Sequence, residues 1–113
     1  MSAITTHVLD TALGCPAAGV PITLELQSGD AWTPLGRGST DADGRLRTLL
    51  PADQRPAAGT YRISFDTATY FAATGVTGFF PSVQITFLVA DPAQHYHVPL
   101  LLSPFSYSTY RGS

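Results

Sequence analysis

The sequence contains no lysine, and this absence excludes several kinds of active site. All six basic residues are arginines. A Schiff-base nucleophile and a phosphate-binding loop both depend on a lysine amine, so neither chemistry is available to this chain. The net charge is -2 and the arginines are dispersed. The sequence therefore offers no basic stripe of the kind that binds nucleic acid.

Cysteine and charged residues are also scarce. Cys15 is the single cysteine, which excludes an intrachain disulfide and a thiolate zinc site. It precedes Pro16 with no base beside it in the sequence, so a nucleophilic role has only weak support. Charged residues make up 12% of the chain, about half the usual share.

Long apolar runs are absent as well. No stretch approaches the roughly 18 apolar residues that a membrane span needs. The first basic residue is Arg37, so the beginning of the sequence lacks the charged region of a signal peptide. We therefore expect a soluble, cytoplasmic protein. The chain has 113 residues, of which 44% are hydrophobic, which predicts one folded domain over residues 1–113 rather than disorder.

Apolar and polar residues alternate with a period of two in most of the chain. The clearest alternation covers residues 20–27, 60–65 and 82–89, and such alternation is typical of strands with one buried face. Turn residues separate these segments from four further candidates. Seven or eight short strands predict an all-β fold in which two sheets form a sandwich. The further candidates are residues 3–9, 32–38, 95–102 and 105–111.

One segment departs from this alternation. Residues 67–74 follow Asp66 and precede Gly75. Aspartate is a good N-cap, and glycine commonly ends a helix. The segment therefore predicts one short helix of about two turns, 3.6 residues to a turn.

The three histidines are the first candidates for chemistry. His95 and His97 are two residues apart, so on a strand their rings point to the same face. The intervening residues on the opposite face are apolar, which suits a core and directs both rings outward. Together with His7 they could ligate zinc, or they could be ordinary surface residues. Their spacing leaves both possibilities open.

A turn motif precedes a second candidate, Arg45. Residues 41–44 read Asp-Ala-Asp-Gly, which is similar to the start of a calcium loop. The later acidic ligands and the terminal glutamate are missing, so we interpret the motif as a β-turn. Arg45 follows it directly. It could be a solvated arginine or a clamp for an anion or oxyanion.

The final residues read Tyr-Arg-Gly-Ser, and this ending resembles the signature of 5-hydroxyisourate hydrolases, the transthyretin-related enzymes of urate breakdown. Four other stretches match that family in order and at compatible spacing, so the resemblance covers essentially the whole chain. They begin with His-Val-Leu-Asp and end with a His-Tyr-His-Val-Pro run; the four stretches are residues 7–10, 40–45, 75–81 and 95–104.

The resemblance implies a fold and an assembly. It implies a transthyretin-like sandwich of about eight strands with one short helix. It also implies a homotetramer, built as a dimer of dimers, with active sites at the dimer–dimer interface. The implied reaction opens the ring of 5-hydroxyisourate with water to give 2-oxo-4-hydroxy-4-carboxy-5-ureidoimidazoline. No metal or other cofactor is expected.

The resemblance also assigns roles to individual residues. It implies that His7, Arg45 and His97 are catalytic, and that a tail lines the site to bind substrate. Ring opening needs a base for the attacking water and a stabiliser for the oxyanion, and histidine and arginine suit these tasks. Which histidine is the base stays open. His95 belongs to the motif without a catalytic assignment. The tail residues are Tyr110, Arg111, Gly112 and Ser113.

Three other functions are compatible with parts of the sequence. A non-catalytic transthyretin-like carrier would share the fold, which by itself does not determine function. Transthyretin lacks the two histidines, the arginine and the tail that are present here. A structural module of a secreted assembly would be expected to carry a signal or linkers. A hydrolase using a metal on the three histidines would lose activity on chelation.

Overall fold

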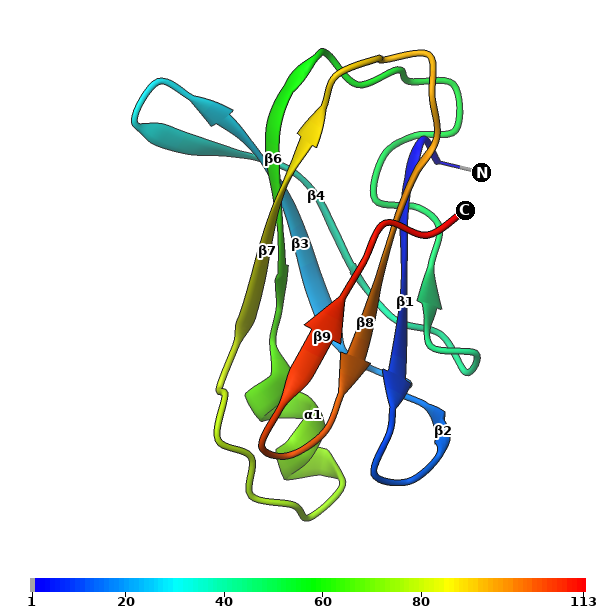
Figure 1. Cartoon of the computed structure of the whole chain (residues 1–113), viewed down its shortest axis with the longest axis vertical. Helices are drawn as coiled ribbons and strands as arrows, with labels where there is room; N and C mark the ends of the chain where they lie inside the picture. The colour runs from blue at the N-terminus through cyan, green and yellow to red at the C-terminus, as the bar shows by residue number, and fades with distance from the viewer. Residues whose placement is uncertain (1) are drawn as a thin grey trace.

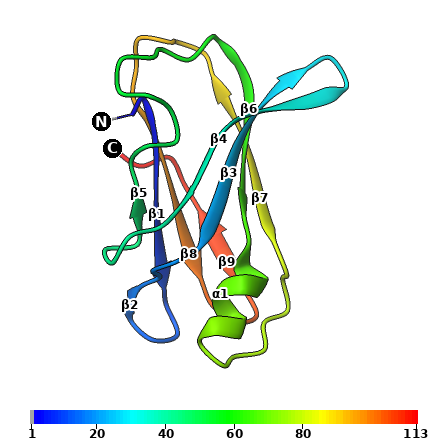
Figure 2. The same ribbon diagram turned by 180° about the vertical axis from the view of Figure 1, so that it is seen from behind.

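The computed structural model describes residues 2–113, which form two β-sheets packed face to face and a short helix at one end (Figures 1 and 2). This architecture confirms the predicted all-β sandwich of two sheets with one short helix. One sheet has the strand order β4-β3-β6-β7, and the other has β2-β1-β8-β9 with β5 on β1. The elements are β1 (Ile4–Asp10), β2 (Cys15–Pro16), β3 (Pro21–Ser28), β4 (Ala31–Ser39), β5 (Arg45–Leu46), β6 (Gly59–Phe65), α1 (Thr67–Ala73), β7 (Val83–Val89), β8 (Tyr96–Leu102) and β9 (Tyr107–Thr109).

The core lies between the sheets, where the alternating apolar residues meet. On β8 the side chains of Tyr96, Val98, Leu100 and Leu102 are buried, whereas His97 is only half-buried. The predicted division of this strand into a core face and an outward histidine face is therefore confirmed. The other sheet contributes buried side chains from β3, β6 and β7, which include Ile22, Leu24, Ile63, Phe65, Val83 and Ile85.

Strand register brings the candidate residues together. Strands β1 and β8 run parallel, and Thr5 lies opposite His97. Strand β5 pairs antiparallel with β1 and places Arg45 opposite His7. Parallel neighbours need a long connection, and here it contains most of the chain. Residues about ninety positions apart in the sequence thus lie side by side on one sheet.

The short helix anchors the far end of β1. Asp66 caps α1 as predicted, because its Oδ1 accepts a hydrogen bond from the Thr69 backbone N–H at 3.1 Å. The Tyr70 hydroxyl donates to Oδ2 of the buried Asp10 at 2.7 Å. Burial and this hydrogen bond raise the pKa of Tyr70, so the phenol stays protonated and joins the helix to β1.

The structure differs from the prediction in its shortest elements. Strands β2 and β5 contain two residues each, too few for a period-two pattern to be visible. The last strand ends at Thr109, although we expected it to continue to residue 111. Beyond it only Gly112 forms a further bridge, to His97. Within residues 2–113, no helix is long and apolar enough to cross a membrane.

Candidate active site

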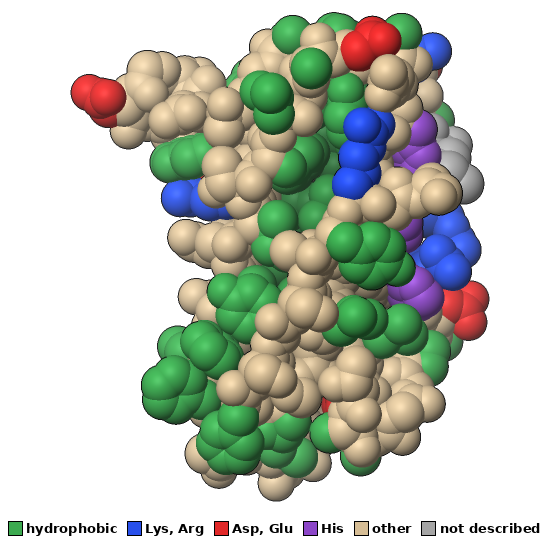
Figure 3. All heavy atoms as spheres, in the orientation of Figure 1, with side chains coloured by type: hydrophobic (Ala, Val, Ile, Leu, Met, Phe, Trp, Pro, Cys, Tyr) green, Lys and Arg blue, Asp and Glu red, His purple; other side chains and the backbone are tan. Residues whose placement is uncertain are grey.

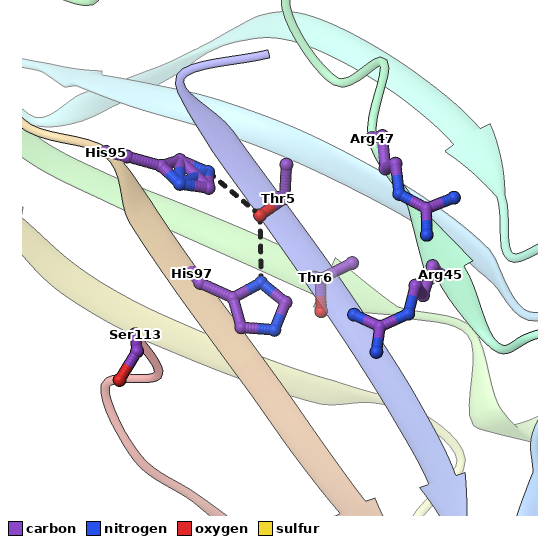
Figure 4. Close-up of a pocket in the computed structure, with 7 residues that line it drawn as sticks. All are labelled: Thr5, Thr6, Arg45, Arg47, His95, His97 and Ser113. Atoms are coloured by element: carbon purple, nitrogen blue, oxygen red, sulfur yellow. Dashed lines mark hydrogen bonds between the residues drawn. The ribbon is translucent and has the colours of Figure 1, made fainter. Parts of the chain in front are cut away.

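A small pocket opens on the face of the sheet that carries the histidines. Its cavity volume is about 130 Å³. Figure 3 shows histidine side chains along one edge of the molecule beside arginine side chains. Figure 4 shows the pocket, to which strands β1 and β8, the segment around β5 and the end of the chain all contribute. Its lining residues are Thr5, Thr6, Arg45, Arg47, His95, His97 and Ser113.

The His97 ring is held by one of its nitrogens and leaves the other open. Its Nδ1 lies 2.8 Å from Oγ1 of Thr5, a threonine that is only 3% exposed. The second ring nitrogen lies on the side that faces Arg45 (Figure 4). This arrangement fixes the orientation of the imidazole and leaves Nε2 for a ligand or a water molecule.

The surroundings of His97 favour its neutral form. Burial lowers the pKa of His97, and the positive charge of Arg45 lowers it further, with smaller effects from His7 and His95. Both causes make a cationic ring less favourable. A neutral imidazole can accept a proton, so His97 has the protonation state that a general base needs.

The segment before Arg45 forms the predicted β-turn. The Gly44 N–H donates to the Asp41 carbonyl at 2.9 Å. Oδ1 of Asp41 accepts from the N–H groups of Arg45 at 3.0 Å and Asp43 at 2.8 Å. The Arg45 hydrogen bond is the main reason that the pKa of Asp41 is lowered. The carboxylate therefore stabilises the turn, and the turn positions Arg45 at the pocket.

A metal ligand set does not form around these acids and histidines. Across residues 2–113, no group of three or more His, Cys, Asp or Glu side chains is arranged to hold a metal ion. Asp41 directs its Oδ1 to backbone N–H groups, and His97 directs its Nδ1 to a hydroxyl. Cys15 is free and exposed on β2 and is not among the residues that line the pocket.

His7 lies beside the pocket rather than in its lining. Its Nε2 is 2.9 Å from the carbonyl oxygen of Asp43. A carbonyl can only accept, so Nε2 carries the hydrogen and Nδ1 is the one nitrogen that can take up a proton. His7 lies opposite Arg45 in the pairing of β1 with β5, and a positive charge on the His7 ring would lower the pKa of His97. The three predicted catalytic residues are thus neighbours.

The backbone of Gly112, in the tail, lies against His97. The Gly112 N–H donates to the His97 carbonyl at 2.8 Å. A Cβ atom on Gly112 would lie 2.6 Å from His97 Cδ2 and 3.3 Å from Cγ. Only glycine lets the backbone lie this close to the ring. This contact positions the next residue, Ser113, in the lining of the pocket.

The two preceding tail residues lie outside this pocket. The Arg111 guanidinium donates to Gln94 Oε1 at 2.8 Å and lies 4.6 Å from the centre of the Tyr96 ring. The Tyr110 side chain is 58% exposed. Together with Ile85 and other residues they line a neighbouring, more apolar groove. Within one copy of the chain, Ser113 is the tail residue that lines the pocket, whereas Tyr110 and Arg111 line the neighbouring groove, which shares His97 with the pocket.

Comparison with known proteins identifies the family. The model of the HIUase/Transthyretin family matches residues 4–112. This chain belongs to that family. The match includes all three predicted catalytic residues and ends at Gly112, next to Ser113.

The HIUase/Transthyretin family contains both enzymes and transthyretins that resemble this chain. A 5-hydroxyisourate hydrolase of Salmonella dublin is 44% identical over 110 residues, which cover 97% of this chain and 80% of that protein. The solved Klebsiella pneumoniae 5-hydroxyisourate hydrolase is 36% identical over the full length of both chains, with a TM-score of 0.86. Transthyretin from Sparus aurata is 35% identical, covers 99% and 97% of the two chains, and has a TM-score of 0.90. The prediction that the chain is a hydrolase is confirmed by its enzyme relatives.

Three pocket residues of this family member are not expected from the sequence. Thr5 and Thr6 are ordinary strand residues, and only the parallel pairing with β8 gives Thr5 a role. Arg47 carries no motif that assigns it a function, yet it lines the pocket. Its position two residues after Arg45 is a usable signal, because alternate residues of an extended segment share a face.

Proposed function

We propose that this chain opens the ring of 5-hydroxyisourate by hydrolysis, in the degradation of urate, with His97 as the general base. The observation that supports this proposal most directly is the His97 ring. Burial and the charge of Arg45 lower its pKa, Thr5 holds its Nδ1, and its Nε2 is open toward Arg45. These are the orientation and protonation state required to activate a water molecule.

The reaction needs three tasks to be performed in the pocket. His97 Nε2 removes a proton from a water molecule as that water attacks a ring carbonyl carbon. Arg45 donates hydrogen bonds from its permanently charged guanidinium to the oxyanion that develops. Collapse of the tetrahedral intermediate breaks the C–N bond, and the nitrogen takes a proton. The product is the opened 2-oxo-4-hydroxy-4-carboxy-5-ureidoimidazoline.

His7 is suited to orienting the substrate or to returning a proton to it. Its Nε2–H is engaged by the Asp43 carbonyl, so it acts through Nδ1 alone. This leaves His97 as the better candidate for the first proton transfer. Ser113 and Arg47, which also line the pocket, would hold the polar edge of a flat heterocycle.

The site of a single copy is incomplete, which supports the proposed tetramer. The pocket volume of about 130 Å³ lies below the roughly 300–1,000 Å³ of ordinary ligand pockets. Tyr110 and Arg111 belong to the substrate-binding tail by resemblance, yet within one copy they line a neighbouring groove that shares only His97 with the pocket. A dimer of dimers with sites between the dimers would enlarge the pocket and bring a second tail to it. We propose a cytoplasmic location for this assembly.

A carrier function is the alternative, because the fold matches that of a transthyretin as closely as that of a hydrolase. A carrier needs affinity for its ligand but no positioned base or oxyanion donor. The pocket here is lined by two histidines, two arginines and hydroxyl groups instead. This chemistry favours hydrolysis.

A direct assay decides between these two functions. Urate oxidase generates 5-hydroxyisourate in the cuvette, and its ultraviolet absorbance decays on its own. Adding the protein should accelerate this decay, and prior treatment with a chelator should leave the acceleration unchanged. A decay equal to the spontaneous rate would overturn the proposal and favour the carrier. Loss of activity on chelation would instead favour a metal-dependent hydrolase.

Replacing Gly112 by alanine should impair turnover without unfolding the protein. The new methyl group would meet the His97 ring at 2.6 Å, so either the ring or the tail must move. Displacement of a catalytic group by about 1 Å can cost roughly 10²-fold, and we expect kcat to fall at least about 10-fold. Ser108→Ala, at an exposed position of β9, is the matched control and should retain full activity. Equal activity of the two variants would contradict the proposed contact.

A further inference from the structure

One buried hydroxyl connects two histidines in the pocket. Thr5 Oγ1 lies 2.8 Å from His97 Nδ1 and 3.0 Å from His95 Nε2. Thr5 is 3% exposed, His97 is half-buried, and His95 is exposed to solvent. The three side chains therefore form a continuous path from the open nitrogen of His97 to the surface (Figure 4).

The number of hydrogens on this path restricts its states. A threonine hydroxyl has one hydrogen to donate and can accept on its lone pairs. If Thr5 donates to His95, then His97 Nδ1 must carry a hydrogen and donate to Thr5, which leaves His97 Nε2 unprotonated. If Thr5 donates to His97, the order is reversed, and His97 Nε2 carries the hydrogen. The two states of the path differ in whether His97 can act as a base.

We propose that Thr5 relays a proton from His97 to His95 during catalysis. The inference rests on the proposed function, because it describes where the proton of the attacking water goes. His97 Nε2 accepts that proton while Nδ1 releases its own to Thr5 Oγ1. The threonine hydrogen passes to His95 Nε2. His97 and Thr5 end neutral, His95 ends as the cation, and no other group changes its proton count.

The location of the charge explains why this path is favourable. Burial and the Arg45 guanidinium lower the pKa of His97, so a cation on His97 would be poorly stabilised. On the exposed His95 the same charge is solvated by water, which is much more favourable than in a partly buried pocket. The relay lets His97 take a proton at the substrate without keeping the charge.

The hydroxyl can be removed with little change in shape. Thr5→Val should lower kcat by about 10- to 100-fold, with KM nearly unchanged. This loss is no larger than the roughly 10²-fold lower end of the range for general acid–base catalysis, because His97 itself remains. Thr5→Ser restores a hydroxyl and should recover kcat to within about 3-fold of the original, since the relay needs only the O–H. Thr23→Val, on β3 of the other sheet, is the matched control and should behave as the original protein. Full activity of Thr5→Val, in a protein whose original form is active, would overturn the relay.

A second variant separates a relay from simple orientation of His97. His95→Gln keeps a side chain that can hydrogen-bond to Thr5, but an amide cannot take up the proton. The relay predicts a fall in kcat of about 10-fold, smaller than the roughly 10²-fold loss expected for a group that acts directly on the substrate, because His97 itself remains. Unchanged kcat in His95→Gln, together with a loss in Thr5→Val, would show that Thr5 only orients the ring and would overturn the proposal.

A spectroscopic measurement tests the path without using activity. Two-bond proton–nitrogen spectra of ¹⁵N-histidine protein report which ring nitrogen carries the hydrogen. Thr5 donates to one ring and accepts from the other. Neutral His95 and His97 should therefore either both carry the hydrogen on Nδ1 or both carry it on Nε2. Thr5→Val should uncouple them. Opposite tautomers in the original protein would overturn the relay, whereas an inactive protein with matching tautomers would refute only the proposed function.

Discussion

Replacing His97 by asparagine should lower kcat for 5-hydroxyisourate by about 10²- to 10⁴-fold, the usual contribution of a general base. Asparagine can keep a hydrogen bond to Thr5 but cannot accept a proton at neutral pH. His97 is outside the core cluster, which is formed by the opposite face of β8. The circular dichroism spectrum and the melting temperature should therefore stay close to those of the original protein. Steady-state kinetics on freshly generated substrate measure the loss.

His7→Asn is the comparison that assigns the roles of the two histidines. His7 has only Nδ1 free, since Asp43 occupies its other nitrogen, so its loss should reduce kcat less than the loss of His97. A larger effect at His7 would reverse the two roles. If both variants kept near-original turnover, the scheme of a histidine base would fail.

Replacing Arg45 by methionine should reduce kcat/KM by about 10²- to 10³-fold, the cost of removing one oxyanion donor. Methionine keeps much of the volume and removes the charged fork of donors. Arg45→Lys should recover only part of the activity, because an ammonium group cannot donate two parallel hydrogen bonds. Arg37→Met, on β4 of the other sheet, is the matched control. Equal kinetics for the Arg45 and Arg37 variants would contradict an oxyanion role.

The same Arg45→Met variant should also shift the pH dependence. The positive charge of Arg45 lowers the pKa of His97. Removing the charge makes protonation of the base easier, so its pKa rises. Activity is lost when the base is protonated, and the acid limb of kcat/KM should therefore move to higher pH. The charge is partly screened by solvent, so the shift should be smaller in high salt. An unchanged or lowered limb would show that Arg45 does not act on the base.

Local sequence patterns predict most of the sandwich because they record which face of each strand is buried. On β8, the apolar Tyr96, Val98 and Leu100 alternate with His97, so the alternation alone indicates both the core face and the outward histidine. Asp66 identifies the start of α1 by the same local logic, since a cap acts on the first turn alone. The catalytic roles come from the family resemblance and not from a local pattern. The family match over residues 4–112 confirms that the chain belongs to the family.

Properties that depend on contacts between distant segments cannot be derived in this way. The parallel pairing of β1 with β8 places Thr5 between two histidines about ninety residues away, and no period within β1 indicates that partner. The resemblance implies that the whole tail lines the site. In one copy of the chain, however, Gly112 bridges to His97, Ser113 lines the pocket, and Tyr110 and Arg111 line the neighbouring groove. Local alternation thus determined the strands and their inward faces, because burial acts on each strand separately. Only the tertiary structure decided which outward residues meet, because strand order and register arise from the packing of the whole chain.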